Sequence, residues 1–127
     1  MRLKLETFGN ARGRNVAAAW IQAVRIQFVP PSFLPAMLAA AIAWARWQVF
    51  DPVAFLLVVI GVTVHHFGLN MLDDVLDYLH AVDRAWGDEK NPYTGGSGVL
   101  TEGLLTVGEL KWGVAVCYSL TVGIWLY

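Results

Sequence analysis

The sequence predicts an all-α membrane protein with about three transmembrane helices, on the basis of its composition and of three long apolar segments. Hydrophobic residues make up 57% of the 127 residues and charged residues 15%, whereas soluble domains contain about 25% charged residues. Each apolar segment approaches the roughly 20 residues that an α-helix needs to cross a bilayer. The net charge of -1 says little, because basic residues concentrate in the first 25 positions and acidic residues between Asp73 and Glu89.

The N-terminal segment, residues 1–25, precedes the first apolar run. Residues 15–24 are expected to form a short helix, with Asn15 as its N-cap. Trp20 is expected to lie at the membrane interface, because its ring is apolar and its N–H is polar. This segment should therefore lie along the membrane surface.

Three spans follow, and we expect them at residues 26–48, 52–79 and 108–127. The first has no charge from Ile26 to Ala45, and its prolines lie near its start, where a helix loses least from missing amide donors: Pro30, Pro31 and Pro35. The second is uncharged from Pro52 to Leu72. Between the second and third spans, residues 80–107 form a polar loop.

The Lys and Arg residues near the span ends predict the orientation. The N-terminal segment and the sequence between the second and third apolar runs carry eight of these nine residues, whereas the turn between the first two spans carries only Arg46. We expect a multi-pass protein of the cell inner (cytoplasmic) membrane, with the N-terminus and the acidic loop in the cytoplasm. We therefore expect the protein to be embedded in the lipid bilayer and to have no nucleic-acid partner.

An acidic motif ends the second span: Asn70-Met-Leu-Asp73-Asp74-Val-Leu-Asp77. Residues at i, i+4 and i+7 of a helix lie within about 40° of one another, so Asn70, Asp74 and Asp77 share a face. Asp73 lies beside them. Carboxylates this close repel each other unless a cation lies among them, and Mg²⁺ commonly takes one or two carboxylates plus substrate phosphates. The motif predicts a divalent-metal site, with solvated acids at a helix end as the alternative.

The loop adds groups that could bind phosphate. Thr94-Gly-Gly-Ser-Gly98 offers backbone amides and hydroxyls to an anion, while Arg84 and Lys90 offer positive charge. A simple connector would also be rich in glycine, so the loop gains its meaning from the acidic motif before it.

Other residues receive structural interpretations. We expect interhelical hydrogen bonds from His65 and His66, with a place near a bound acceptor as the alternative for His66. Tyr78 and Tyr93 are expected to anchor the interface. Cys117 is expected to be a small packing residue.

The pattern Asn70-x-x-Asp73-Asp74-x-x-Asp77-x5-Asp83, followed by Asn91-Pro-Tyr-Thr-Gly-Gly-Ser-Gly-Val-Leu100, resembles the first aspartate-rich motif and loop of the UbiA superfamily of intramembrane prenyltransferases. It is most similar to the 1,4-dihydroxy-2-naphthoate polyprenyltransferase branch, in which Asn stands where this chain has Asp73. Trp20-Ile-Gln-Ala-Val-Arg25 resembles the family's N-terminal segment, which commonly reads Arg-Pro, so Ile26 departs from the pattern. The resemblance covers nearly the whole chain.

This resemblance implies Mg²⁺-dependent transfer of a polyprenyl group from polyprenyl diphosphate to an aromatic acceptor. The acceptor that we expect is 1,4-dihydroxy-2-naphthoate in menaquinone biosynthesis, with 4-hydroxybenzoate, a chlorin, a haem or another lipid as alternatives. It implies catalytic roles for Asn70, Asp74 and Asp77. Metal binding would fall to Asp73, Asp74, Asp77 and Asp83. Diphosphate binding would fall to Arg25, Arg84, Lys90, Thr94, Gly95, Gly96 and Ser97.

The family fold is a bundle of about nine transmembrane helices with a second aspartate-rich motif in its other half. The resemblance therefore implies that this chain is the N-terminal part of that fold, inactive alone, with a second chain or further spans completing the bundle. Two alternatives stay open. One is a non-catalytic membrane protein that binds divalent cations or anionic headgroups, and the other is a structural subunit that forms half of a bundle.

Overall fold

A computed structural model describes residues 16–80 and 96–127 of the chain. The regular structure in these stretches is entirely helical, which confirms the predicted all-α class for the described part. Residues 16–24 form a first helix, which is followed by η1 (Ile26–Phe28), α2 (Pro30–Trp47), α3 (Pro52–Leu79) and α5 (Val107–Leu126).

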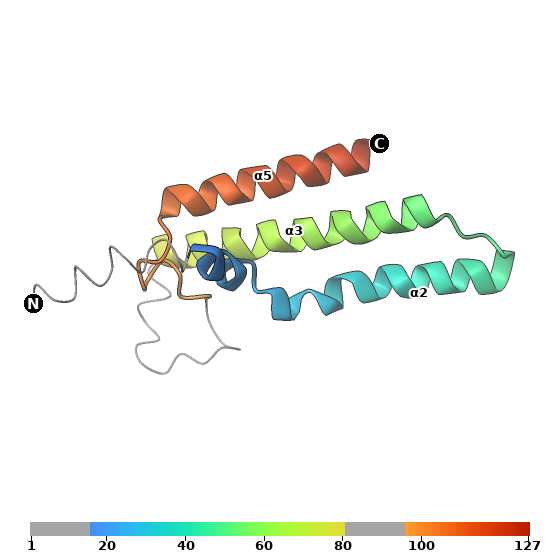
Figure 1. Ribbon diagram of the computed structural model, residues 1–127, viewed down its shortest axis with the longest axis horizontal. Helices are drawn as coiled ribbons and strands as arrows, with labels where there is room; N and C mark the ends of the chain where they lie inside the picture. The colour runs from blue at the N-terminus through green and yellow to red at the C-terminus, as the bar shows by residue number, and fades with distance from the viewer. Residues whose placement is uncertain (1–15, 81–95) are drawn as a thin grey trace, which may run out of the picture.

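The three long helices lie side by side and alternate in direction (Figure 1). The α3 helix packs against both α2 and α5, and more extensively against α5. The helix of residues 16–24 crosses the end of the bundle at which α2 begins, α3 ends and α5 begins, and the segment of residues 96–106 lies at the same end. The acidic motif of α3 therefore lies close to both of these segments.

The backbone bends sharply between residues 16–24 and α2. Arg25 closes the first helix in the left-handed conformation, with φ 51° and ψ 56°, and η1 follows at once. Neither Pro30 nor Pro31 can donate a backbone hydrogen bond to the preceding turn, so a continuous helix is interrupted there. The helical segments Val16–Phe28 and Pro30–Trp47 meet at a bend of 48°. The span expected at residues 26–48 is thus broken near its start.

Polar caps begin the other two long helices. The Asp51 carboxylate accepts hydrogen bonds from the backbone amides of Val53 and Ala54, at 2.9 and 3.1 Å, and so caps α3. Thr106 and Glu109 form a reciprocal capping box at the start of α5. The bounds of α3 coincide with those expected from the sequence, and α5 lies within one residue of its expected range.

Glycines allow α5 to approach its neighbours closely. A Cβ atom placed on Gly113 would lie 2.8 Å from the Trp20 ring and 2.9 Å from the Met71 sulfur. A Cβ atom on Gly68 of α3 would lie 3.1 Å from Cys117, which agrees with the packing role expected for that cysteine. Trp20 is half-buried and packs against the buried core at this contact.

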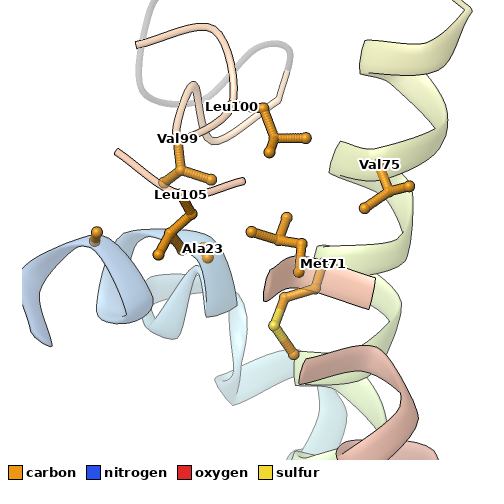
Figure 2. Packing of buried hydrophobic residues seen from close by; sticks show 8 residues of the cluster. Ala23, Met71, Val75, Val99, Leu100 and Leu105 are labelled. Carbon is orange, nitrogen blue, oxygen red and sulfur yellow. The ribbon is translucent and has the colours of Figure 1, made fainter. Parts of the chain in front are cut away.

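The buried core lies at the same end of the bundle (Figure 2). It joins the first helix, α3, the segment before α5, and α5 itself through eight apolar side chains: Ala19, Ala23, Met71, Val75, Val99, Leu100, Leu105 and Leu110. Tyr78, expected from the sequence to anchor the interface, is half-buried and packs against this core. The core fixes the position of the acidic motif relative to residues 96–106.

Away from this end, the long helices expose large apolar side chains. No residue of α2 is fully buried. Exposed examples from the three helices are Leu34, Leu38, Ile42, Val53, Leu56, Ile60, Leu120, Val122 and Trp125. Of the described helices, α3 is long and apolar enough to cross a membrane by itself, and the bent pair 16–28 and 30–47 qualifies only if it counts as one span. Only 11% of the most apolar stretch of α3 is buried within the chain.

Candidate functional site at the C-terminal end of α3

The length of α3 places the acidic motif beyond its apolar part. A helix of 28 residues is about 42 Å long at 1.5 Å per residue, whereas a bilayer's hydrocarbon core is about 30 Å thick. If the hydrocarbon core of the bilayer began at Pro52, it would end near Met71, and the last two turns of α3 would project beyond the hydrocarbon. These turns carry Asp73, Asp74 and Asp77.

The Asp74 carboxylate is buried, with 2% of the residue exposed, and both of its oxygens accept hydrogen bonds. The Ser97 backbone amide donates to Oδ1 at 2.8 Å, and the Ser97 hydroxyl donates to Oδ2. Arg25 Nη2 lies 3.5 Å from Oδ1 and forms an ion pair with it. A buried carboxylate is stable only when its charge is paired and its oxygens accept hydrogen bonds, and this arrangement supplies both.

Arg25 reaches this position because of its unusual backbone. A left-handed conformation costs a residue other than glycine on the order of 1–3 kcal/mol. Here the turn is held by two backbone hydrogen bonds, from Arg25 N to Gln22 O at 3.2 Å and from Phe28 N to Arg25 O at 2.9 Å. The guanidinium, on a side chain that is 16% exposed, then meets Asp74.

Asn70 completes the contact between α3 and the first helix. Its Nδ2 donates a hydrogen bond to the Val24 carbonyl at 2.8 Å, which supplies a partner for one of the carbonyls at the end of that helix. Asn70 and Asp74 thus both reach residues 24–25, as their i, i+4 spacing predicts. In the structure Asn70 acts as a polar anchor between two helices.

The segment carrying Ser97 is held by contacts that the sequence did not reveal. The Gln22 side chain donates to the Ser97 carbonyl at 2.7 Å, across 75 residues of sequence. Gly98 is buried with φ +84°, a conformation that favours glycine, and its carbonyl accepts a hydrogen bond from Glu102 N at 2.9 Å. The apolar pairs Val99-Leu100, within this turn, and Leu104-Leu105, just after it, are the signal in the sequence from which the inward packing of this segment could have been predicted.

The other predicted site residues are placed only in part. Asp73 is exposed, Asp77 is half-buried, and Gly96 lies beside Ser97 in the described segment. Five lie outside the described residues: Asp83, Arg84, Lys90, Thr94 and Gly95. The same holds for Tyr93 and Asn15. The structure therefore brings together Arg25, Asn70, Asp74 and Ser97 from the predicted set.

The described residues fit a Mg²⁺ site only partly. Mg²⁺ needs one or two carboxylates in addition to phosphate oxygens and water. Asp74 and Asp77, three residues apart on α3, could be that pair, but Asp74 already accepts bonds from Ser97 and Arg25. Across residues 16–80 and 96–127, no three His, Cys, Asp or Glu side chains form a group that could hold a metal.

The two neighbouring histidines of α3 take different partners. The His66 Nδ1 and the Ser32 hydroxyl of α2 form a hydrogen bond of 2.8 Å, which confirms the interhelical hydrogen bond expected for His66. The His65 ring meets the Tyr118 ring of α5 edge-on, with the ring centroids 5.2 Å apart. Both histidines therefore link α3 to a neighbouring helix.

No protein-family model matches the chain, and no curated protein or solved structure matches it significantly. Any assignment of function therefore depends on the motif residues and on the geometry described above.

Proposed function

We propose that this chain supplies one side of the active site of a UbiA-like membrane prenyltransferase, which transfers a polyprenyl group from a diphosphate to an aromatic acceptor such as 1,4-dihydroxy-2-naphthoate. One observation carries the proposal. The buried Asp74 carboxylate contacts both Arg25 and Ser97, so residues from three separate stretches of the sequence resemblance lie together at the end of the longest apolar helix.

The exposed apolar side chains support a multi-pass membrane location. In a soluble protein, a helix as apolar as α3 would be buried in the core, because exposing its side chains to water is unfavourable. Here its apolar stretch is largely exposed, and so is most of α2. Within this proposal α2, α3 and α5 all cross the inner membrane, with the Asp74 end in the cytoplasm.

The chemistry follows from the charges at this end. Arg25 supplies a cation beside the acidic turns, and the amides near Ser97 could face an anion. Mg²⁺, when bound, would neutralise a leaving diphosphate. In that arrangement Asp77 is the carboxylate that we assign to the metal, and Asp74 holds Arg25 and the loop in position.

Binding of a prenyl diphosphate tests this assignment. We expect the detergent-solubilised chain to bind a radiolabelled prenyl diphosphate in the presence of Mg²⁺ and to release it when the metal is chelated. Asp77→Asn should weaken Mg²⁺-dependent binding by about tenfold or more, the scale on which changes around metal sites lower affinity. Asp51→Asn, at the opposite end of α3, is the matched control and should bind normally.

The second measurement is transfer of the polyprenyl group to candidate aromatic acceptors. It would use protein expressed from any longer reading frame that continues past Tyr127. Tight binding of the prenyl diphosphate that changes neither on removal of Mg²⁺ nor in the Asp77→Asn variant would contradict the metal-binding role proposed for Asp77.

A non-catalytic role is the second candidate, and one observation favours it: both Asp74 oxygens are already engaged by Ser97 and Arg25. In that case the cluster is a structural clamp, and the acidic end binds cations or anionic headgroups only at its surface. The same binding assay separates the two functions. If Asp74 is only part of a structural clamp, the chain should bind the prenyl diphosphate no better than it binds anionic phospholipid vesicles.

A further inference from the structure

An open cavity of about 610 Å³ lies between the start of α2, the centre of α3 and the C-terminal half of α5, and several of its apolar lining residues are exposed. Its lining includes Ser32, His65, His66, Tyr118 and Thr121, and the remaining lining residues are apolar. Cavities of roughly 300–1,000 Å³ commonly hold a small organic ligand. The described lining contains no Asp, Glu, Lys or Arg, so a bound molecule would be uncharged.

His66 supplies the polar group that needs a partner. Its Nε2 is buried and has no hydrogen-bond partner in the part of the chain that the structure describes. A buried polar atom without a partner costs about 1–3 kcal/mol. The two aliphatic hydroxyls of the lining are already engaged, since Ser32 pairs with His66 Nδ1 and Thr121 donates to the Cys117 carbonyl at 2.9 Å.

The Ser32–His66 bond restricts what that partner can be. If the Ser32 hydroxyl donates to Nδ1, then Nε2 carries the proton and needs an acceptor. If Nδ1 donates to Ser32, then Nε2 needs a donor. A hydroxyl group serves in either case, because it both donates and accepts. A lone water would require two to four polar partners, which this mainly apolar lining is poorly suited to provide.

We infer that this cavity binds a neutral, membrane-soluble alcohol, whose hydroxyl pairs with His66 Nε2 and whose apolar body fills the space between α3 and α5. The site is separate from the contacts of Asp74, because eight residues of helix place the two about 12 Å apart along α3. The inference therefore does not depend on the proposed prenyl transfer.

Photolabelling of the full chain in lipid nanodiscs tests the inference. The probes are a long-chain primary alcohol that carries a diazirine and the same chain ending in a methyl group. We expect the alcohol to label α3 and α5 peptides about two- to tenfold more than the methyl-ended chain, which is the range given by one net hydrogen bond. His66→Phe keeps a ring but removes Nε2, so it should reduce this ratio to about one.

His65→Phe is the matched control, because His65 lines the same cavity but contacts Tyr118 through its ring. It should leave the alcohol preference unchanged. Val122→Trp, which fills the cavity, should remove labelling by both probes. Equal labelling by the two probes, or an alcohol preference that survives His66→Phe, would overturn the inference.

A spectroscopic measurement on the unaltered chain tests the inference without any substitution, so its result does not depend on whether the variants fold. The chain contains three histidines, so ¹⁵N-histidine NMR can follow each imidazole separately. The unlabelled alcohol should shift the His66 ring nitrogens in a saturable way and leave those of His80 unchanged. Ring signals of His66 that do not respond to the alcohol would overturn the inference independently of any substitution.

Discussion

Asp73 and Asp74 are neighbours with the same side chain, yet one is exposed and the other is buried. A rotation of about 100° between successive residues of a helix turns Asp73 away from the contact that Asp74 makes with Arg25 and Ser97. The sequence indicated correctly that Asn70 and Asp74 share a face. It did not reveal that both Asp74 oxygens accept hydrogen bonds, because the partners Arg25 and Ser97 lie 49 and 23 residues away.

Asp74→Asn should destabilise the fold. The amide removes the charge that pairs with Arg25 and directs an N–H₂ group toward groups that themselves donate. Breaking a buried pair by altering one partner costs on the order of 3–5 kcal/mol. The loss should appear as a lower midpoint of chemical unfolding in detergent, followed by circular dichroism. Asp73→Asn is the matched control and should change stability by less than about 0.5 kcal/mol, so equal effects of the two variants would contradict the role given to Asp74.

At the scale of elements, the helices were largely predictable and their contacts were not. Apolar length and the prolines gave the bounds of α3, and the bounds of α5 followed to within one residue. At the bend before α2, the break at Pro30 and Pro31 is visible in the sequence, but no local pattern signalled the left-handed conformation of Arg25. The close approach of Trp20 to Gly113 depends on how the first helix packs across the bundle end, and therefore on contacts distant in sequence.

Two glycines of α5 offer a matched test of that packing. Gly113→Ala would place a methyl group 2.8 Å from the Trp20 ring, and overpacking of this kind costs about 1–3 kcal/mol. A Cβ atom on Gly123 meets nothing within 4 Å, so Gly123→Ala should stabilise by up to about 1 kcal/mol through helix propensity. Thermal unfolding of both variants in one detergent measures the difference. A Gly113→Ala protein that melts no lower than Gly123→Ala would show that the close contact is absent.

At the scale of the whole molecule, the bundle has two different halves. One end holds the buried core, the ion pair of Asp74 and the Ser97 segment, whereas the rest consists of helices with exposed apolar sides. Composition was enough to predict this apolar character. The assembly of the bundle end could not be predicted, because residues 16–25, the end of α3 and residues 96–106 meet there only after the chain has reversed direction.

Single cysteines should report the membrane arrangement. In a Cys117→Ser background, Val49→Cys lies in the turn between α2 and α3, and Glu102→Cys lies near Ser97; both positions are exposed. If the helices cross the membrane, a membrane-impermeant maleimide should label these two sites from opposite sides of sealed vesicles. Leu38→Cys, exposed in the middle of α2, should react slowly because lipid covers it. Rapid labelling of Leu38→Cys from the aqueous phase would contradict a membrane-spanning α2.

The contacts of Asp74 also set an order of events during synthesis. Arg25 and Asp74 can meet once α3 has formed, but Ser97 leaves the ribosome 23 residues after Asp74. Until then the carboxylate lacks the two hydrogen bonds that Ser97 donates in the folded chain. The end of α3 therefore reaches its final form late, when the segment before α5 arrives and its apolar side chains close over the first helix.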